Sequence, residues 1–184
     1  QKLTKRKIVW VVVIVLIVMV PVAMQFTDEV NSREAFAYSV ILLAMGGLYE
    51  LARFVRTHGR AYRAAFWIGL GAAFLLAWVN GAVGIIGSED NPANLLYGGV
   101  FAVGIIGSLI SRLKPRGMMY TLFAAAIAQM LVPLTALVIW NPAFSSGVVA
   151  IFGMNAFFAV LFVTSALLFR RSAGEEHDYI ASVN

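Results

Sequence analysis

The sequence predicts an all-α integral membrane protein: a bundle of six transmembrane helices with both termini in the cytoplasm. The first observation is composition, because 61% of the 184 residues are hydrophobic, 12% are charged and the mean hydropathy is +0.85. Soluble domains are about half apolar and about a quarter charged. The second observation is that the apolar residues form six long runs, each close to the roughly 20 residues that span a bilayer as a helix. The third is that nearly all cations fall between alternate runs.

The six predicted spans lie between a basic N-terminal segment, residues 1–7, and a polar C-terminal tail, residues 170–184. In order, the spans cover about 8–26, 35–56, 62–87, 93–113, 117–140 and 146–169. The first run is longer than the core of a signal peptide, which has roughly 7 to 15 residues, and no A-x-A-like site follows it. We therefore expect it to be retained as a helix.

The orientation follows from the positive-inside rule, which places Lys and Arg in cytoplasmic loops. Thirteen of the 14 Lys and Arg residues fall in the N-terminus, after the second and fourth spans, or after the sixth. The remaining one, Arg33, lies between the first and second spans. Both termini are therefore predicted to be cytoplasmic, which requires an even number of spans.

The third and fourth spans are rich in small residues and are predicted to pack on each other as a hairpin. In the third span, small side chains recur every four residues from Ala65 to Gly81, which places them on one helix face. Lipid offers no hydrophobic drive for helix association, so close packing through small residues must replace it. The residues predicted to make these contacts are Gly69, Ala73, Ala77, Gly81, Gly84, Gly98 and Gly104.

The turn between these spans is the most distinctive polar stretch of the chain. Asn91 suits the N-cap of the next helix, and Pro92 suits its first turn. The alternative is a cation site at the outer face, with oxygen ligands from Glu89, Asp90, Asn91 and Asn94.

A few polar residues lie inside the predicted spans. Asn80, Gln129 and Asn155 are placed at similar depths in the outer half, where they are expected either to hydrogen-bond between helices or to line a solute path. Glu50 is the acidic residue within a span, and it lies close to Arg53 and Arg56. It is either an interfacial ion pair or a functional group.

Three segments resemble an uncharacterised family of small bacterial polytopic membrane proteins. They are Gln25–Asn31, the stretch W-x-N-G-A-V-G-I-I-G-S-E-D-N-P-A-N at Trp78–Asn94, and Arg116–Met118. The resemblance implies a bacterial cytoplasmic membrane as the location and carries no activity, ligand or site.

The sequence favours a non-enzymatic protein that works by association, as a homo-oligomer or an accessory subunit of a larger membrane complex. The first alternative is a small permease or channel built around Asn80, Gln129, Asn155 and Glu50. The second is binding of lipid or of an apolar cofactor. No cysteine is present and both histidines, His58 and His177, lie outside the spans, so thiolate metal sites and haem held between two histidines within the bilayer are excluded. We expect no cofactor other than bound lipid, and no nucleic-acid partner.

Overall fold

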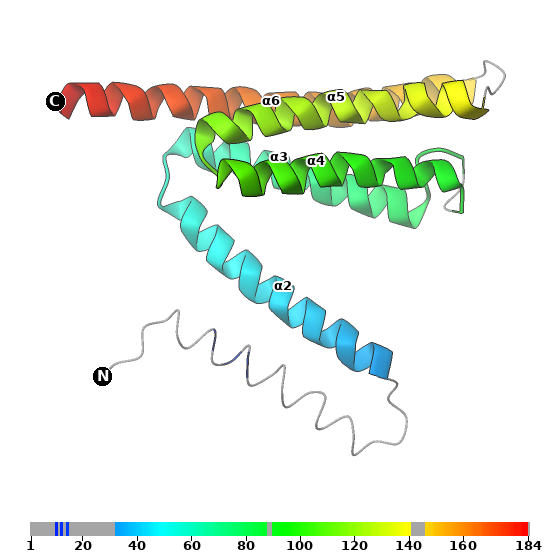
Figure 1. The fold of residues 1–184 in the computed structure, drawn as a ribbon, viewed down its shortest axis with the longest axis horizontal. Helices are drawn as coiled ribbons and strands as arrows, with labels where there is room; N and C mark the ends of the chain where they lie inside the picture. Colours follow the sequence, from blue (N-terminus) through cyan, green and yellow to red (C-terminus); the bar gives the residue numbers. More distant parts are fainter. Residues whose placement is uncertain are drawn as a thin grey trace. The chain divides into compact units, whose positions relative to one another are not determined.

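The computed structural model describes residues 32–87, 90–140 and 146–183, together with Trp10, Val12 and Ile14; it does not describe the side chains of residues 32–39, 140 and 176–183. Every regular element in these ranges is a helix (Figure 1), which confirms the all-α prediction for them. The helices are α2 (Ser32–Arg56), α3 (Arg60–Ala82), the 3-10 helix η1 (Pro92–Leu96), α4 (Tyr97–Ser111), α5 (Pro115–Trp140) and α6 (Ser146–Val183).

The described part of the chain contains four helical segments that are long and apolar enough to cross a membrane, which makes it a multi-pass membrane protein. They are Arg60–Ala82, Pro92–Ser111, Pro115–Ile139 and Ser146–Glu175, and they correspond to the predicted third to sixth spans. The predicted first span lies outside the described residues apart from three positions. The predicted second span corresponds to α2, whose first eight side chains also lie outside them.

The chain divides into two compact units, Gln1–Thr57 and His58–Asn184. In the first unit, the indole Nε1 of Trp10 donates a hydrogen bond of 2.8 Å to Oε1 of Glu50 on α2. This bond joins a residue of the predicted first span to a residue of the predicted second span.

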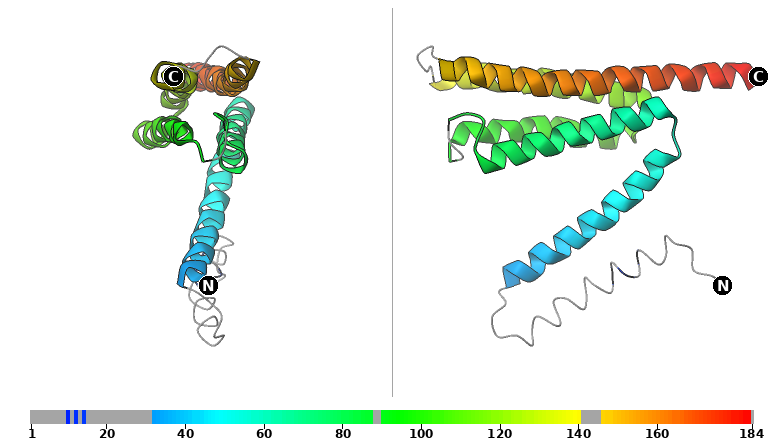
Figure 2. Two further views of the ribbon diagram at one scale, coloured as in Figure 1. Left: turned by 90° about the vertical axis from the view of Figure 1, so that its right-hand side faces the viewer. Right: turned by 180° about the vertical axis from the view of Figure 1, so that it is seen from behind.

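In the second unit, α6 packs against both α3 and α5, and α4 packs against α5. The end-on view in Figure 2 shows the same pairing, with α6 beside α3 and α5 beside α4. Small residues allow two of these contacts. A Cβ atom at Gly69 of α3 would lie 2.8 Å from Oγ of Ser165 on α6, and one at Gly107 of α4 would lie 2.5 Å from Cγ2 of Thr121 on α5.

The predicted hairpin of α3 on α4 is therefore wrong, since these two helices are not a main packing pair. Of the predicted packing residues, Gly69 is buried, Ala73 is half-buried and Ala77 is exposed. A Cβ atom at Gly81, Gly98 or Gly104 would meet nothing within 4 Å among the described atoms. Small residues permit close approach, but they do not specify which helix approaches.

The helix ends differ from the prediction in two places. Helix α3 stops at Ala82, five residues early, because Gly84 and Gly87 have positive φ angles of 69° and 75° that glycine adopts without strain. Helix α6 continues beyond Phe169 to Val183, so the predicted polar tail is helical up to that residue (Figure 1). An i,i+4 ion pair between Arg171 and Glu175, at 3.1 Å, supports this extension on the exposed surface.

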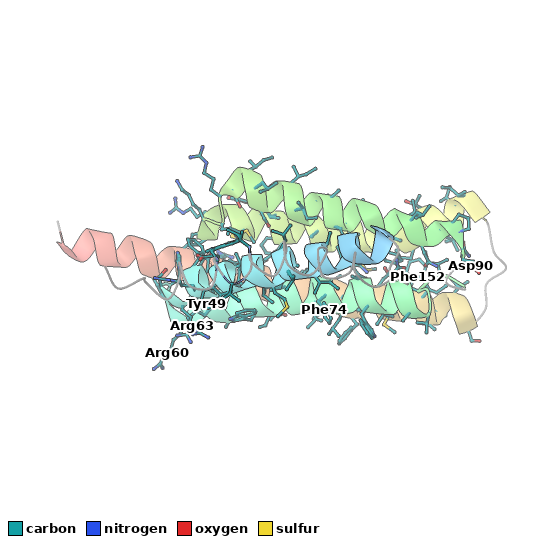
Figure 3. All side chains as sticks on the ribbon, turned by 90° about the horizontal axis from the view of Figure 1, so that it is seen from below. Tyr49, Arg60, Arg63, Phe74, Asp90 and Phe152 are labelled. Atoms are coloured by element: carbon teal, nitrogen blue, oxygen red, sulfur yellow. The ribbon has the colours of Figure 1, made fainter. Side chains whose placement is uncertain are left out.

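The turn between α4 and α5 closes the end of the bundle opposite Asp90. Arg112 and Leu113 adopt left-handed φ angles of 50° and 59°. The hydroxyl of Tyr62 at the start of α3 donates a 2.8 Å hydrogen bond to the carbonyl of Leu113, which holds this turn against the neighbouring helix. Figure 3 shows Arg60 and Arg63 near this end of α3, and Asp90 and Phe152 near the other end of the unit.

Candidate functional site

Three polar side chains from three helices meet in the interior of the second unit. Asn155 on α6 accepts two hydrogen bonds at Oδ1, one of 2.9 Å from Nε2 of Gln129 on α5 and one of 3.1 Å from the hydroxyl of Tyr97 on α4. All three side chains have 0% exposure. The Nδ2 group of Asn155 donates a 2.8 Å bond to the carbonyl of Ile151 one turn earlier on α6. We call Tyr97, Gln129 and Asn155 the amide cluster.

One acceptor of the amide cluster is unsatisfied. Oε1 of Gln129 is buried and has no hydrogen-bond partner among the described atoms. Rotating the side-chain amide of Gln129 by 180° would not give its oxygen a partner, because Oε1 would then face Oδ1 of Asn155, which is also an acceptor. A buried polar atom without a partner costs about 1–3 kcal/mol.

Asn80 does not join this cluster. Its Nδ2 group lies 3.4 Å from the carbonyl oxygen of Asn94, and its Oδ1 atom is buried without a partner among the described atoms. The structure therefore brings Gln129 and Asn155 together and pairs Asn80 with the start of the next helix instead.

The loop between α3 and α4 is organised by two asparagine side chains. Asn94 is 6% exposed. Its Oδ1 atom accepts hydrogen bonds from the backbone N–H groups of Ile85 at 3.1 Å and Ile86 at 2.9 Å. Oδ1 of Asn91 accepts a 2.9 Å bond from the N–H of Ala93. The predicted N-cap role of Asn91, with Pro92 in the first turn, is confirmed for η1.

The cation hypothesis for this turn gains no support from the geometry. The side-chain oxygens of Asn91 and Asn94 already accept backbone hydrogen bonds. Asp90 is exposed, and Glu89 lies outside the described residues. Within the described part of the chain, no group of three or more His, Asp or Glu side chains is placed to hold a metal ion.

A pocket of about 320 Å³ lies between this loop, α5 and α6. We call it the loop pocket. Its lining is mostly apolar, with no charged side chain, and consists of Ile86, Gly87, Asn91, Ala93, Pro133, Ala136, Leu137, Gly147, Val148, Ile151 and Phe152. None of the three predicted intramembrane polar residues, Asn80, Gln129 and Asn155, lines it.

Glu50 belongs to the first unit and is half-buried there. The hydrogen bond from Trp10 was not anticipated, because sequence reasoning paired Glu50 with the nearby arginines. An indole N–H is a donor that needs no charge, and it suits the membrane interface, where tryptophan is enriched.

Two buried residues that form hydrogen bonds between helices were not predicted from the sequence. Tyr97 was not among the predicted polar residues of the spans, but it is fully buried. Val100, Gly107 and Ser111 follow Tyr97 by 3, 10 and 14 residues, which places all four on one face of α4. This spacing could have predicted that Tyr97 faces another helix. Ser165 on α6 donates a 2.6 Å bond to the carbonyl of Ala65 on α3; nothing in its local sequence indicates this partner.

The chemistry of the amide cluster is that of a neutral hydrogen-bonding site. A phenol and two amides hold three helices together, and one amide oxygen remains able to accept a bond. No family model, curated protein or solved structure matches the chain. The resemblance to a bacterial membrane-protein family therefore stays a prediction.

Proposed function

We propose that this chain crosses a bacterial cytoplasmic membrane six times, keeps both termini in the cytoplasm, and works by assembly as a homo-oligomer or an accessory subunit. The asymmetry of the Lys and Arg residues supports the orientation. The hydrogen bond between Trp10 and Glu50 supports a packed pair formed by the first two spans.

The observation that carries the assembly proposal is the set of uncovered glycines on α4. Gly98 and Gly99 are exposed, and a Cβ atom at either would meet nothing within 4 Å among the described atoms. A glycine inside a helix costs about 0.5–1 kcal/mol relative to alanine. At Gly107 the close contact with Thr121 explains why a glycine is present, because it leaves no room for a side chain. At Gly98 and Gly99 the other described helices of the second unit supply no such contact, and a helix from another subunit would.

The amide cluster supports assembly over transport. A permease needs polar groups that face a hydrated path. Gln129 and Asn155 instead bond directly to each other, and Asn80 bonds to the backbone of Asn94. The loop pocket, which is mostly apolar, does not connect them.

Single-cysteine crosslinking tests the proposal cleanly because the chain has no cysteine of its own. Gly99→Cys at the start of α4 should form a disulfide-linked dimer on mild oxidation in native membranes. Val138→Cys is the matched control, because Val138 is 81% exposed on α5 and does not lie on a face of small residues.

Native mass spectrometry after gentle extraction identifies the partner. A mass of two or more copies indicates a homo-oligomer, and an additional polypeptide indicates an accessory subunit. A monomer with no crosslink through Gly99→Cys in membranes would refute assembly through this face.

A further inference from the structure

A second pocket lies between the start of α3 and the later part of α6, at the end of the second unit away from the loop pocket. It has a volume of about 440 Å³ and is lined by Arg60, Ala61, Leu168, Arg171 and Glu175. We call it the basic pocket. Helices α3 and α6 pack on each other within the second unit, so both walls of the basic pocket belong to the same compact body.

The basic pocket carries one uncompensated positive charge. Nε of Arg171 pairs with Oε1 of Glu175 at 3.1 Å. Oε2 of Glu175 lies 3.8 Å from the position of a Cβ atom built at Gly59, so this carboxylate is held beside the start of α3. Arg60 has no hydrogen-bond or ion-pair partner among the described residues. Two arginines and one glutamate therefore leave a formal charge of about +1 in the pocket, which complements a single anionic group.

The position of the pocket along the spans indicates which anion it meets. Arg60 is the first residue of a helix that can cross the membrane, and Arg171 follows Phe169, the last apolar residue of the predicted sixth span, by two positions. Cationic side chains at the ends of apolar spans lie at the level of the lipid head groups. Basic pockets between transmembrane helices are sites for anionic head groups. At this level the anion is the phosphate of a lipid.

The remaining lining residues distinguish between lipids. A guanidinium group matches the geometry of phosphate oxygens, and Leu168 offers apolar surface beside the two arginines. A zwitterionic lipid also brings a cation, but the carboxylate that lines the pocket is already paired with Arg171. We propose that the basic pocket binds an anionic phospholipid, such as phosphatidylglycerol, with its phosphate between Arg60 and Arg171.

Native mass spectrometry of the purified protein tests this, with detergent solutions titrated with phosphatidylglycerol or with phosphatidylcholine of the same acyl chains. The first lipid should bind at a concentration about fivefold lower than the second, as expected for one arginine near a membrane surface. Equal binding of the two lipids would overturn the proposal.

Three substitutions locate the site. Arg60→Gln should weaken binding of phosphatidylglycerol about fivefold. Arg116→Gln is the matched control, because Arg116 is an exposed arginine at the start of α5 that does not line the basic pocket, and it should leave binding unchanged. Glu175→Gln should strengthen binding, because it releases Arg171 and removes the negative charge of the pocket. Equal effects of Arg60→Gln and Arg116→Gln, or weaker binding by Glu175→Gln, would contradict the site.

Two controls complete the experiment. A large excess of inorganic phosphate should not displace the bound lipid; displacement would show that the pocket takes free phosphate and would overturn the lipid assignment. If a variant fails to fold, as judged by circular dichroism, the comparison of the two lipids on the unmodified protein still decides the outcome. Because binding is measured per copy on isolated protein, the result is independent of topology and of assembly through α4.

Discussion

Replacing Asn155 with leucine tests the amide cluster most directly, because one side chain accepts the hydrogen bonds of two other helices. The change keeps the size of the side chain and removes the acceptor of both Gln129 and Tyr97. Hydrogen bonds between helices in membrane proteins average about 0.6 kcal/mol, with a maximum of about 1.7 kcal/mol. Losing two of them should lower the free energy of unfolding by about 1 to 3 kcal/mol, and both partners would be left buried with an unpaired donor.

The assay is the free energy of unfolding in bicelles, measured by steric trapping. Tyr97→Phe removes one bond and keeps the ring, so it should cost about 0.6 kcal/mol. In the double variant that loss should disappear, because the acceptor is already gone. Since Tyr97→Phe then also removes an unpaired buried donor, the coupling energy should be at least as large as the cost of Tyr97→Phe alone.

Thr164→Val is the matched control. The hydroxyl of Thr164 is exposed on α6 and donates only to the carbonyl of Val160 in the same helix, so its loss should change stability by less than about 0.5 kcal/mol. Additive effects of Tyr97→Phe and Asn155→Leu would refute the shared hydrogen bond, as would an Asn155→Leu protein as stable as the unmodified one.

Three further predictions concern the loop, helix packing and topology. Asn94→Ala should lower the thermal unfolding temperature in detergent more than Asn91→Ala does, because Asn94 accepts hydrogen bonds from two buried N–H groups and Asn91 accepts one. The loss of the Asn91 cap should cost about 0.5–2 kcal/mol. The reverse order would contradict the hydrogen-bond assignment. Gly107→Ala should lower the free energy of unfolding by about 1–3 kcal/mol, because the new Cβ atom would overlap with Thr121. Gly104→Ala should leave the free energy of unfolding equal or higher, because its Cβ atom would meet open space. Equal losses in the two variants would exclude the α4–α5 contact. Reporter fusions in the loops 27–34 and 56–63 should report opposite compartments, and the same compartment for both would remove the six-span topology.

Much of the outer loop could be predicted from residues that are neighbours in sequence. The N-cap role of Asn91 depends on an N–H only two residues away, so residue type and spacing suffice. The role of Asn94 could not be found in the same way. Its side chain reaches back to Ile85 and Ile86, and that contact exists only once Gly84 and Gly87 have turned the chain through positive φ angles.

The sequence by itself determined which segments are apolar enough to cross a membrane and which ends carry the cations. It did so because a bilayer selects for about 20 consecutive apolar residues and for retained positive loops. Only the tertiary structure decided which helices are neighbours. Glycines on α3 and α4 allow close approach to any helix, and a polar residue at a given depth pairs according to the rotation of its helix about its axis. That rotation, set by the packing of α6 against both α3 and α5, brings Asn155 to Gln129 and Tyr97 and leaves Asn80 with Asn94.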